Sequence, residues 1–154
     1  MEIRKAVRED AAVAASLAIQ IWGAHTQEEL EEEFVDIIED GNSAVFLAVE
    51  EGEATGFAQC GLRHDYVEGT SGGTVGYLEG IFIKEPYRKK GIGSKLLEAC
   101  EAWAKGMGCL EFASDCELEN DISLQFHLHS GFQEANRIIC FAKRFSDTTC
   151  RKCE

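Results

Sequence analysis

The alternation of apolar and polar residues divides the chain into short strands and amphipathic helices. Apolar residues spaced three or four apart predict helices, whereas short apolar or β-branched runs predict strands. Helices are expected over residues 11–22, from Thr26 onward, over 91–106 and over 122–130. Strands are expected over residues 2–7, 44–49, 55–62, 75–83, 111–114 and 133–145. The order β-α-α-β-β-β-α-β-α-β predicts an α/β (α+β) domain with a single mixed sheet flanked by helices.

Local signals mark several helix boundaries. Thr26 stands three residues before Glu29, the spacing of a capping box in which a hydroxyl and a carboxylate satisfy orphan amides. Asp10 is expected to cap the first helix. Gly131 directly follows the last predicted helix and is the residue type that most often ends a helix in the left-handed conformation.

The composition is that of one acidic domain. The chain has 154 residues, 45% of them hydrophobic, which suits a single core without disulfide or metal staples. Its formal net charge of −13 favours solubility, can attract cations and argues against nucleic acid as a partner. The sequence shows neither an apolar run long enough to span a bilayer nor a signal peptide. We therefore expect a cytoplasmic protein without a membrane partner.

The seven cysteines predict reduced thiols. Their number is odd, and five lie in apolar stretches where buried thiols are expected, namely Cys60, Cys100, Cys109, Cys116 and Cys140. Cys150 and Cys153 form one C-x-x-C pair without a second pair or nearby histidines, which is weak evidence for zinc. We therefore expect no metal site.

The most informative stretch joins the strand at residues 75–83 to the following helix. It contains the densest basic cluster and two glycines, in the order Arg88, Lys89, Lys90, Gly91, Ile92 and Gly93. Glycines let the backbone approach an anion closely, and the amides and dipole of a helix N-terminus attract it. A G-x-G pair alone would favour an ordinary solvated turn. The complete R-x-x-G-x-G string after a strand favours an anion site, and it matches neither a Walker nor a Rossmann loop.

This string resembles motif A of the GNAT acetyltransferases, whose Q/R-x-x-G-x-G/A loop binds the pyrophosphate of acetyl-CoA. The resemblance implies the GNAT fold, with splayed central strands, and acetyl-CoA as co-substrate. The residues it assigns to the pyrophosphate are Arg88, Lys89, Lys90, Gly91, Ile92, Gly93 and Ser94. It also implies a bulge near Glu79 and Gly80. Backbone groups of Ile81, Phe82 and Ile83 would then pair with the pantetheine arm, and an amide there would polarise the thioester carbonyl.

A second stretch resembles another motif of the same family. Asn120 opens the short helix that Gly131 and Phe132 close, and the resemblance places it on the pantetheine, although it is also a plausible plain N-cap. Many family members carry a tyrosine four residues before the Gly-Phe pair, which protonates the departing thiolate. Here His127 stands in that position. The general acid is therefore open between His127 and water, and a merely packed histidine is a further alternative.

Four segments resemble the aminoglycoside 6'-N-acetyltransferases more specifically, at residues 65–70, 76–82, 111–120 and 134–137. The likeness extends over residues 1–145, which we take as one GNAT domain, with residues 146–154 as a C-terminal tail. It implies a site for a small cationic amine, the aminoglycoside.

The same resemblance assigns the residues of that site. Trp22 and Tyr66 would form walls that face the antibiotic, and Glu79 and Asp115 would form the floor beside the thioester. Asn136, or alternatively its neighbour Glu134, would lie at the rim. Without the resemblance, Trp22, Tyr66 and Asp115 could equally be packing, loop and turn residues. Glu79 interrupts an apolar strand, so its carboxylate must face a cleft or a cation.

The expected reaction is direct attack of the 6'-amine on the thioester in a ternary complex. Asp115, or Glu79 through water, would accept the ammonium proton. A polyamine or peptide amine is the alternative acceptor, and an acyl-CoA-binding module without turnover is the alternative class. The resemblance also implies a homodimer, with the apolar residues 138–141 near the interface.

Overall fold

Strands that follow one another in the sequence also lie side by side in the sheet. The computed structural model describes residues 1–145. The strands are β1 (Glu2–Lys5), β2 (Ser43–Glu50), β3 (Glu53–Arg63), β4 (Val75–Ile83) and β5 (Phe112–Ala113). The helices are η1 (Arg8–Asp10), α1 (Ala11–Ala18), α2 (Gln27–Glu39), η2 (Glu85–Tyr87), α3 (Ile92–Gly106) and α4 (Asp121–His129). This mixed sheet with helices on both faces confirms the predicted fold class.

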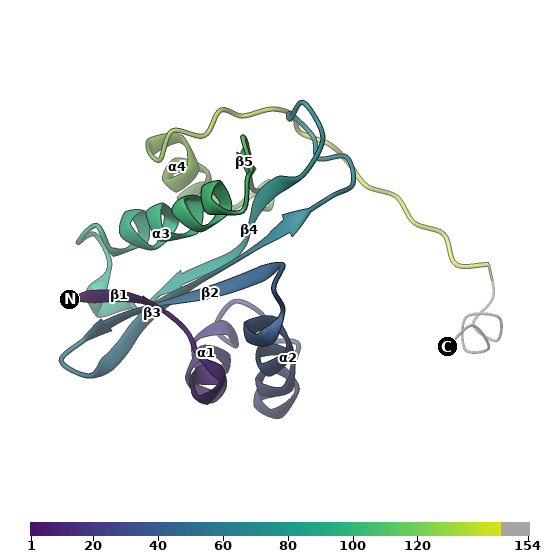
Figure 1. The fold of residues 1–154 in the computed structure, drawn as a ribbon. Helices are drawn as coiled ribbons and strands as arrows, with labels where there is room; N and C mark the ends of the chain where they lie inside the picture. Colours follow the sequence, from purple (N-terminus) through teal and green to yellow (C-terminus); the bar gives the residue numbers. More distant parts are fainter. Residues whose placement is uncertain (146–154) are drawn as a thin grey trace.

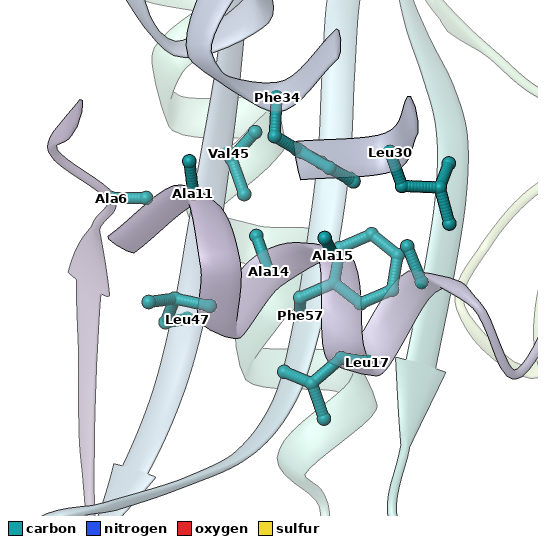
Figure 2. Packing of buried hydrophobic residues seen from close by; sticks show 11 residues of the cluster. Ala6, Ala11, Ala14, Ala15, Leu17, Leu30, Phe34, Val45, Leu47 and Phe57 are labelled. Carbon is teal, nitrogen blue, oxygen red and sulfur yellow. The ribbon is translucent and has the colours of Figure 1, made fainter. Parts of the chain in front are cut away.

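The helices cover opposite faces of the sheet (Figure 1). Helices α1 and α2 lie on one face, and α3 with α4 lies on the other. On the α1–α2 face, Phe57 of β3 and Phe34 of α2 are fully buried and meet edge to face, with ring centroids 5.9 Å apart. Small residues of α1, such as Ala14 and Ala15, let the helix pack closely on the sheet (Figure 2). Burial of these apolar side chains is the main force that fixes the layers.

Strand β4 diverges from its neighbour partway along. The first four strands pair antiparallel, and β5 pairs parallel to β4 at Gly76 and Tyr77. Beyond these pairs, the backbone of β4 as far as Ile83 is flanked by β3 on one side and by no strand of residues 1–145 on the other. The second half of β4 therefore offers an open edge.

A bulge marks the point of divergence. Gln59 of β3 pairs with Gly80, and Cys60 pairs with Leu78, so Glu79 is an extra residue in β4. A bulge bends its strand and re-aims the side chain that it carries. The bulge predicted near Glu79 and Gly80 is thereby confirmed.

The helix signals had mixed outcomes. Thr26 and Glu29 form the predicted capping box, with each side chain accepting a hydrogen bond of 3.1 Å from the other residue's amide. Asp10 is at the N-cap position of α1, as predicted, but its carboxylate makes no cap bond and instead accepts two bonds from the guanidinium of Arg4. The first helix is also shorter than predicted and ends at Ala18, before a turn that leads to Trp22.

The predicted strand over residues 133–145 is wrong. This segment contains no strand. It first passes the β3–β4 connection, where Asn136 binds Glu68, and then extends away from the body of the molecule (the yellow trace in Figure 1). Its apolar side chains are exposed, including Ile139 and Phe141, the latter to 90%. A strand needs hydrogen-bonding partners, and an apolar run by itself does not supply them. We call residues 133–145 the C-terminal arm.

The cysteines follow the prediction in part. Cys60, Cys100 and Cys109 are buried thiols, as expected, whereas Cys116 and Cys140 are exposed, contrary to expectation. Both exposed residues lie in extended segments that the core does not cover. The pair Cys150 and Cys153 lies outside the described residues. Within the described part of the chain, no helix is long and apolar enough to cross a membrane.

Candidate active site

The turn between β4 and α3 has the backbone geometry of an anion site. Lys89 and Gly91 both adopt left-handed conformations, with φ of 64° and 81°. Gly91 is the N-cap of α3 and has no side chain with which to bind the first-turn amides. These amides carry the positive end of the helix dipole, a ready site for a phosphate group.

Basic side chains surround this turn. Arg88, Lys89 and Lys90 are all exposed beside it. The Nε of Arg88 donates a 2.7 Å hydrogen bond to the carbonyl of Ile83, and its guanidinium lies 5.4 Å from the centroid of the Phe82 ring. Arg88 is therefore held against the end of β4, where it keeps a positive charge next to the turn.

The turn connects directly to the open edge of β4. Ile81, Phe82 and Ile83 are half-buried and pair with β3 on one side only. Helix α4 packs against the first turn of α3, where a β-carbon at Gly93 would lie only 3.1 Å from the ring of Phe126. Ile92 is the first residue of α3 and its side chain is buried in the core, so its amide rather than its side chain is available to a ligand.

The two predicted floor residues belong to one polar network. Arg63 makes a bidentate ion pair with Glu79, with N–O distances of 2.9 and 3.2 Å. The guanidinium also lies 3.6 Å above the ring centroid of Tyr77. The hydroxyl of Tyr77 in turn donates a hydrogen bond to Asp115. Glu79 and Asp115 are thus joined through a cation and a phenol.

The protonation states within this network follow from its contacts. The hydrogen bond to Glu79 raises the pKa of Arg63, so the guanidinium stays charged. Burial, together with the hydrogen bond to Asp115, raises the pKa of Tyr77 and keeps its phenol a proton donor. The prediction missed Arg63 and Tyr77. The two-residue spacing of Tyr77 and Glu79 on one strand was the available signal that they share a face.

Trp22 lies beside the bulge. Its ring packs edge-on against Phe57 at 6.1 Å and covers Gly80, where a β-carbon would lie 2.7 Å from the indole. Trp22 and Glu79 line a shared hollow of about 310 Å³, to which His25 and Glu33 also contribute. Gly80 is therefore required for the tryptophan to approach the strand.

Tyr66 and Asn136 form a separate group. Both bind the carboxylate of Glu68, Tyr66 through its hydroxyl at 3.1 Å and Asn136 through its amide nitrogen at 2.9 Å. Glu134 instead pairs with Arg137. Among residues 1–145, the hydrogen bonds of this group do not reach Glu79 or Asp115. Glu68 was missed, because nothing in the sequence pattern links the loop to the arm.

Helix α4 supplies the last polar groups. The side chain of Asn120 accepts a 3.0 Å hydrogen bond from the amide of Ser123, which confirms that it is an N-cap. His127 contacts the carbonyl oxygen of Ser123 through Nδ1 and the hydroxyl of Ser114 through Nε2, each at 2.7 Å. His127 is thus part of a hydrogen-bonded chain that ends at β5.

Comparisons with known proteins agree with this geometry. A model of the acetyltransferase (GNAT) family matches residues 9–132. The aminoglycoside N(6')-acetyltransferase type 1 of Salmonella typhimurium strain LT2 is 36% identical, over 94% of this chain and 99% of the relative.

Two solved structures are similar over nearly their whole length. AAC(6')-Iy in complex with the bisubstrate analogue CoA-S-monomethyl-acetylneamine superposes with a TM-score of 0.89 at 35% identity, covering 93% of this chain and 97% of that one. The same enzyme in complex with CoA gives a TM-score of 0.90 at 35% identity, with coverage of 93% and 94%. Family model, identity and superposition agree, and the chain belongs to the GNAT family of acetyltransferases.

Proposed function

We propose that this protein transfers the acetyl group of acetyl-CoA to the 6'-amino group of aminoglycosides, and so confers resistance to these antibiotics. The observation that carries the proposal is the position of Asp115. It follows β5 at the point where β4 and β5 diverge, and it is joined through Tyr77 and Arg63 to Glu79. A proton acceptor therefore stands beside the open edge of β4. Relatives that are 36% and 39% identical to this chain are aminoglycoside N(6')-acetyltransferases.

The turn before α3 suits the diphosphate of acetyl-CoA. A side chain on residue 91 would have to adopt a left-handed φ, and glycine does so without strain. The amides of Ile92, Gly93 and Ser94 would bind the phosphate oxygens, and Arg88, Lys89 and Lys90 would balance their charge. The pantetheine arm would then follow Ile81, Phe82 and Ile83 along β4 toward Asp115, with Asn120 nearby.

The acceptor side suits a polycation with a sugar ring. Glu79 and Asp115 offer carboxylates, and Trp22 and Tyr66 offer aromatic surface, Tyr66 being 72% exposed. Asn136 would contribute at the rim, next to Glu68. The net charge of −13 would raise the local concentration of ammonium groups.

The reaction would proceed in a ternary complex. Asp115, or Glu79 through water, takes a proton from the 6'-ammonium, and the amine then attacks the thioester carbon. A backbone amide near Ile81 stabilises the tetrahedral oxyanion. Holding both substrates in one orientation supplies much of the acceleration.

A thiol-release assay tests the function. Acetyl-CoA is incubated with the protein and kanamycin, which carries a 6'-amino group, and with spermidine as a simple polyamine. We expect thiol release that depends on kanamycin and a product acetylated at the 6' nitrogen. Faster release with spermidine would instead identify a polyamine acetyltransferase. Acetyl-CoA binding without release from any amine would identify a binding module.

We also propose a homodimer in which the C-terminal arm packs against a second copy. The arm carries Ile138, Ile139, Phe141 and Phe145, all at least 68% exposed in the single chain. Contiguous apolar surface of this kind marks an interaction site. Residues 1–145 would form the domain and 146–154 a tail. The free cysteines of the described residues suit a reducing, cytoplasmic location.

Replacing Ile139 and Phe141 together by aspartate is expected to shift the protein from dimer to monomer, because two charges cannot be buried unpaired. Sedimentation velocity at several concentrations measures the change. Leu110→Asp is the matched control, since Leu110 is 98% exposed and lies outside the arm. A monomeric wild-type protein, or a double variant that remains dimeric, would refute this interface.

A further inference from the structure

The two residues that follow β5 place polar side chains on opposite faces of the sheet. Ser114 and Asp115 follow β5 directly, and their side chains contact different parts of the molecule. Asp115 reaches the hydroxyl of Tyr77, whereas Ser114 contacts His127 on α4 and lies 3.5 Å from the carbonyl oxygen of Leu78. Leu78 itself packs in the core beside α3, on the face away from Tyr77. The point of divergence between β4 and β5 therefore has a carboxylate on one face and a hydroxyl on the other.

The contacts of His127 determine its tautomer. Its Nδ1 lies 2.7 Å from the carbonyl oxygen of Ser123, which can only accept a hydrogen bond, so Nδ1 must carry a proton. In the neutral ring, Nε2 is therefore an acceptor and the Ser114 hydroxyl donates to it. In the imidazolium ion, Nε2 donates to Ser114. The O–H bond of Ser114 can then point toward the carbonyl oxygen of Leu78 and the open edge of β4.

Packing holds the imidazole in this position. The His127 ring lies 5.7 Å from the centroid of Phe126 and 5.1 Å from that of Phe132. Phe126 in turn contacts Gly93 in the first turn of α3. Helix α4 therefore spans the distance from the anion-binding turn to the end of β5, along the path proposed for the pantetheine arm.

From this arrangement we infer that Ser114 donates a proton to the departing sulfur of CoA and that His127 replaces that proton. The inference rests on the proposed function, which places the thioester at the divergence of β4 and β5. The amine is deprotonated on the Asp115 face, and the thiolate is protonated on the α4 face. Ser114 is then a catalytic residue, and His127 acts through it.

The step balances as follows in atoms and charge. The bond between the acetyl carbon and sulfur breaks, and its electron pair stays on sulfur. Sulfur takes the proton of Ser114 Oγ, while that oxygen takes the Nε2 proton of the imidazolium ion of His127. Nδ1 keeps its proton on the carbonyl of Ser123. The neutral imidazole then regains a proton from water. The substrate ammonium loses two protons on becoming an amide, the first to Asp115 and the second to water. One of these offsets the proton that His127 takes back, and the other is the net proton released.

The test compares single-turnover thiol release among four proteins: wild type, Ser114→Ala, Ser114→Thr and His127→Gln. We expect Ser114→Ala to slow release by about tenfold to a hundredfold, within the range of general acid catalysis. Ser114→Thr keeps the hydroxyl and should restore most of the rate. Affinity for CoA, measured by calorimetry, should stay within about threefold, because the hydroxyl acts on the leaving group rather than on ground-state binding.

Two further measurements separate a relay from a structural role. The variant with both Ser114→Ala and His127→Gln should be no slower than Ser114→Ala alone, because both residues act on one proton. Ser43→Ala is the matched control, since the hydroxyl of Ser43 likewise hydrogen-bonds a neighbouring side chain, that of Asp40. Multiplicative losses in the double variant, or an unchanged rate in Ser114→Ala, would overturn the inference.

A spectroscopic measurement tests the inference without depending on turnover. Nitrogen-15 spectra of the histidine rings should show neutral His127 with its proton on Nδ1, and Ser114→Ala should shift the Nε2 resonance. A proton on Nε2 in the neutral ring would contradict the relay geometry even if acetylation proceeds. If the wild type releases no thiol with any aminoglycoside, the proposed function fails, and the spectra still report on the Ser114–His127 pair.

Discussion

Replacement of Asp115 by asparagine is expected to lower kcat/KM for an aminoglycoside by about 100-fold or more, the usual effect of removing a general base. Asparagine can still accept the hydrogen bond from Tyr77, so the local structure should survive while the proton acceptor is lost. Initial rates of thiol release at several aminoglycoside concentrations give the value. Tyr77→Phe is the control, since it removes the hydrogen bond and keeps the carboxylate.

Glu79→Gln completes this experiment. The carboxylate of Glu79 is already paired with Arg63, so we expect its replacement to cost about tenfold, mainly in substrate affinity. A larger loss from Glu79→Gln than from Asp115→Asn would exchange their roles. If both variants keep full kcat/KM across pH, neither carboxylate is the base.

Phe57→Ala is expected to lower the free energy of unfolding by about 3–5 kcal/mol, because it empties a fully buried site. Figure 2 shows Phe57 at the centre of the cluster between α1, α2 and the sheet. The substitution removes edge-on contacts with both Phe34 and Trp22. Since Trp22 covers the bulge at Gly80, substrate affinity should fall as well. Urea unfolding followed by circular dichroism measures the first effect.

Phe57→Leu is the matched control. It keeps most of the volume and should cost less than about 1.5 kcal/mol. A loss below about 1 kcal/mol in Phe57→Ala would mean that the neighbouring side chains collapse into the cavity, and that this cluster does not anchor the α1–α2 face.

Sequence reasoning predicted the parts of the fold that local chemistry determines. The capping box at Thr26 and the N-cap at Asn120 are confirmed, because each depends on a few neighbouring residues, whereas the bulge at Glu79 was expected from the family resemblance. The arm beyond Phe132 was predicted as a buried strand, because its apolar run has strand composition. Composition does not specify which chain supplies the hydrogen-bonding partner, so this prediction was wrong for the single chain.

The candidate site shows the same division. Individual residues such as Asp115 and Trp22 could be named from the sequence, and their roles remain predictions. Their partners could not be named. Arg63 and Glu68 lie in or beside the β3–β4 connection, and their contacts join residues far apart in the chain. Such pairings depend on strand register and on the path of the arm, which no local pattern encodes.

If Glu79 receives ammonium groups as proposed, its ion pair with Arg63 changes how the protein discriminates among ligands. An ammonium group that binds Glu79 would compete with Arg63 for the carboxylate. Its gain in binding free energy would then be the difference between the two ion pairs, not the full energy of a new one. Adding further positive charge to a ligand then brings little advantage at this position. The affinity of a ligand at this position would then depend on its shape. A ligand that leaves the guanidinium of Arg63 stacked on Tyr77 would bind more tightly than one that displaces it.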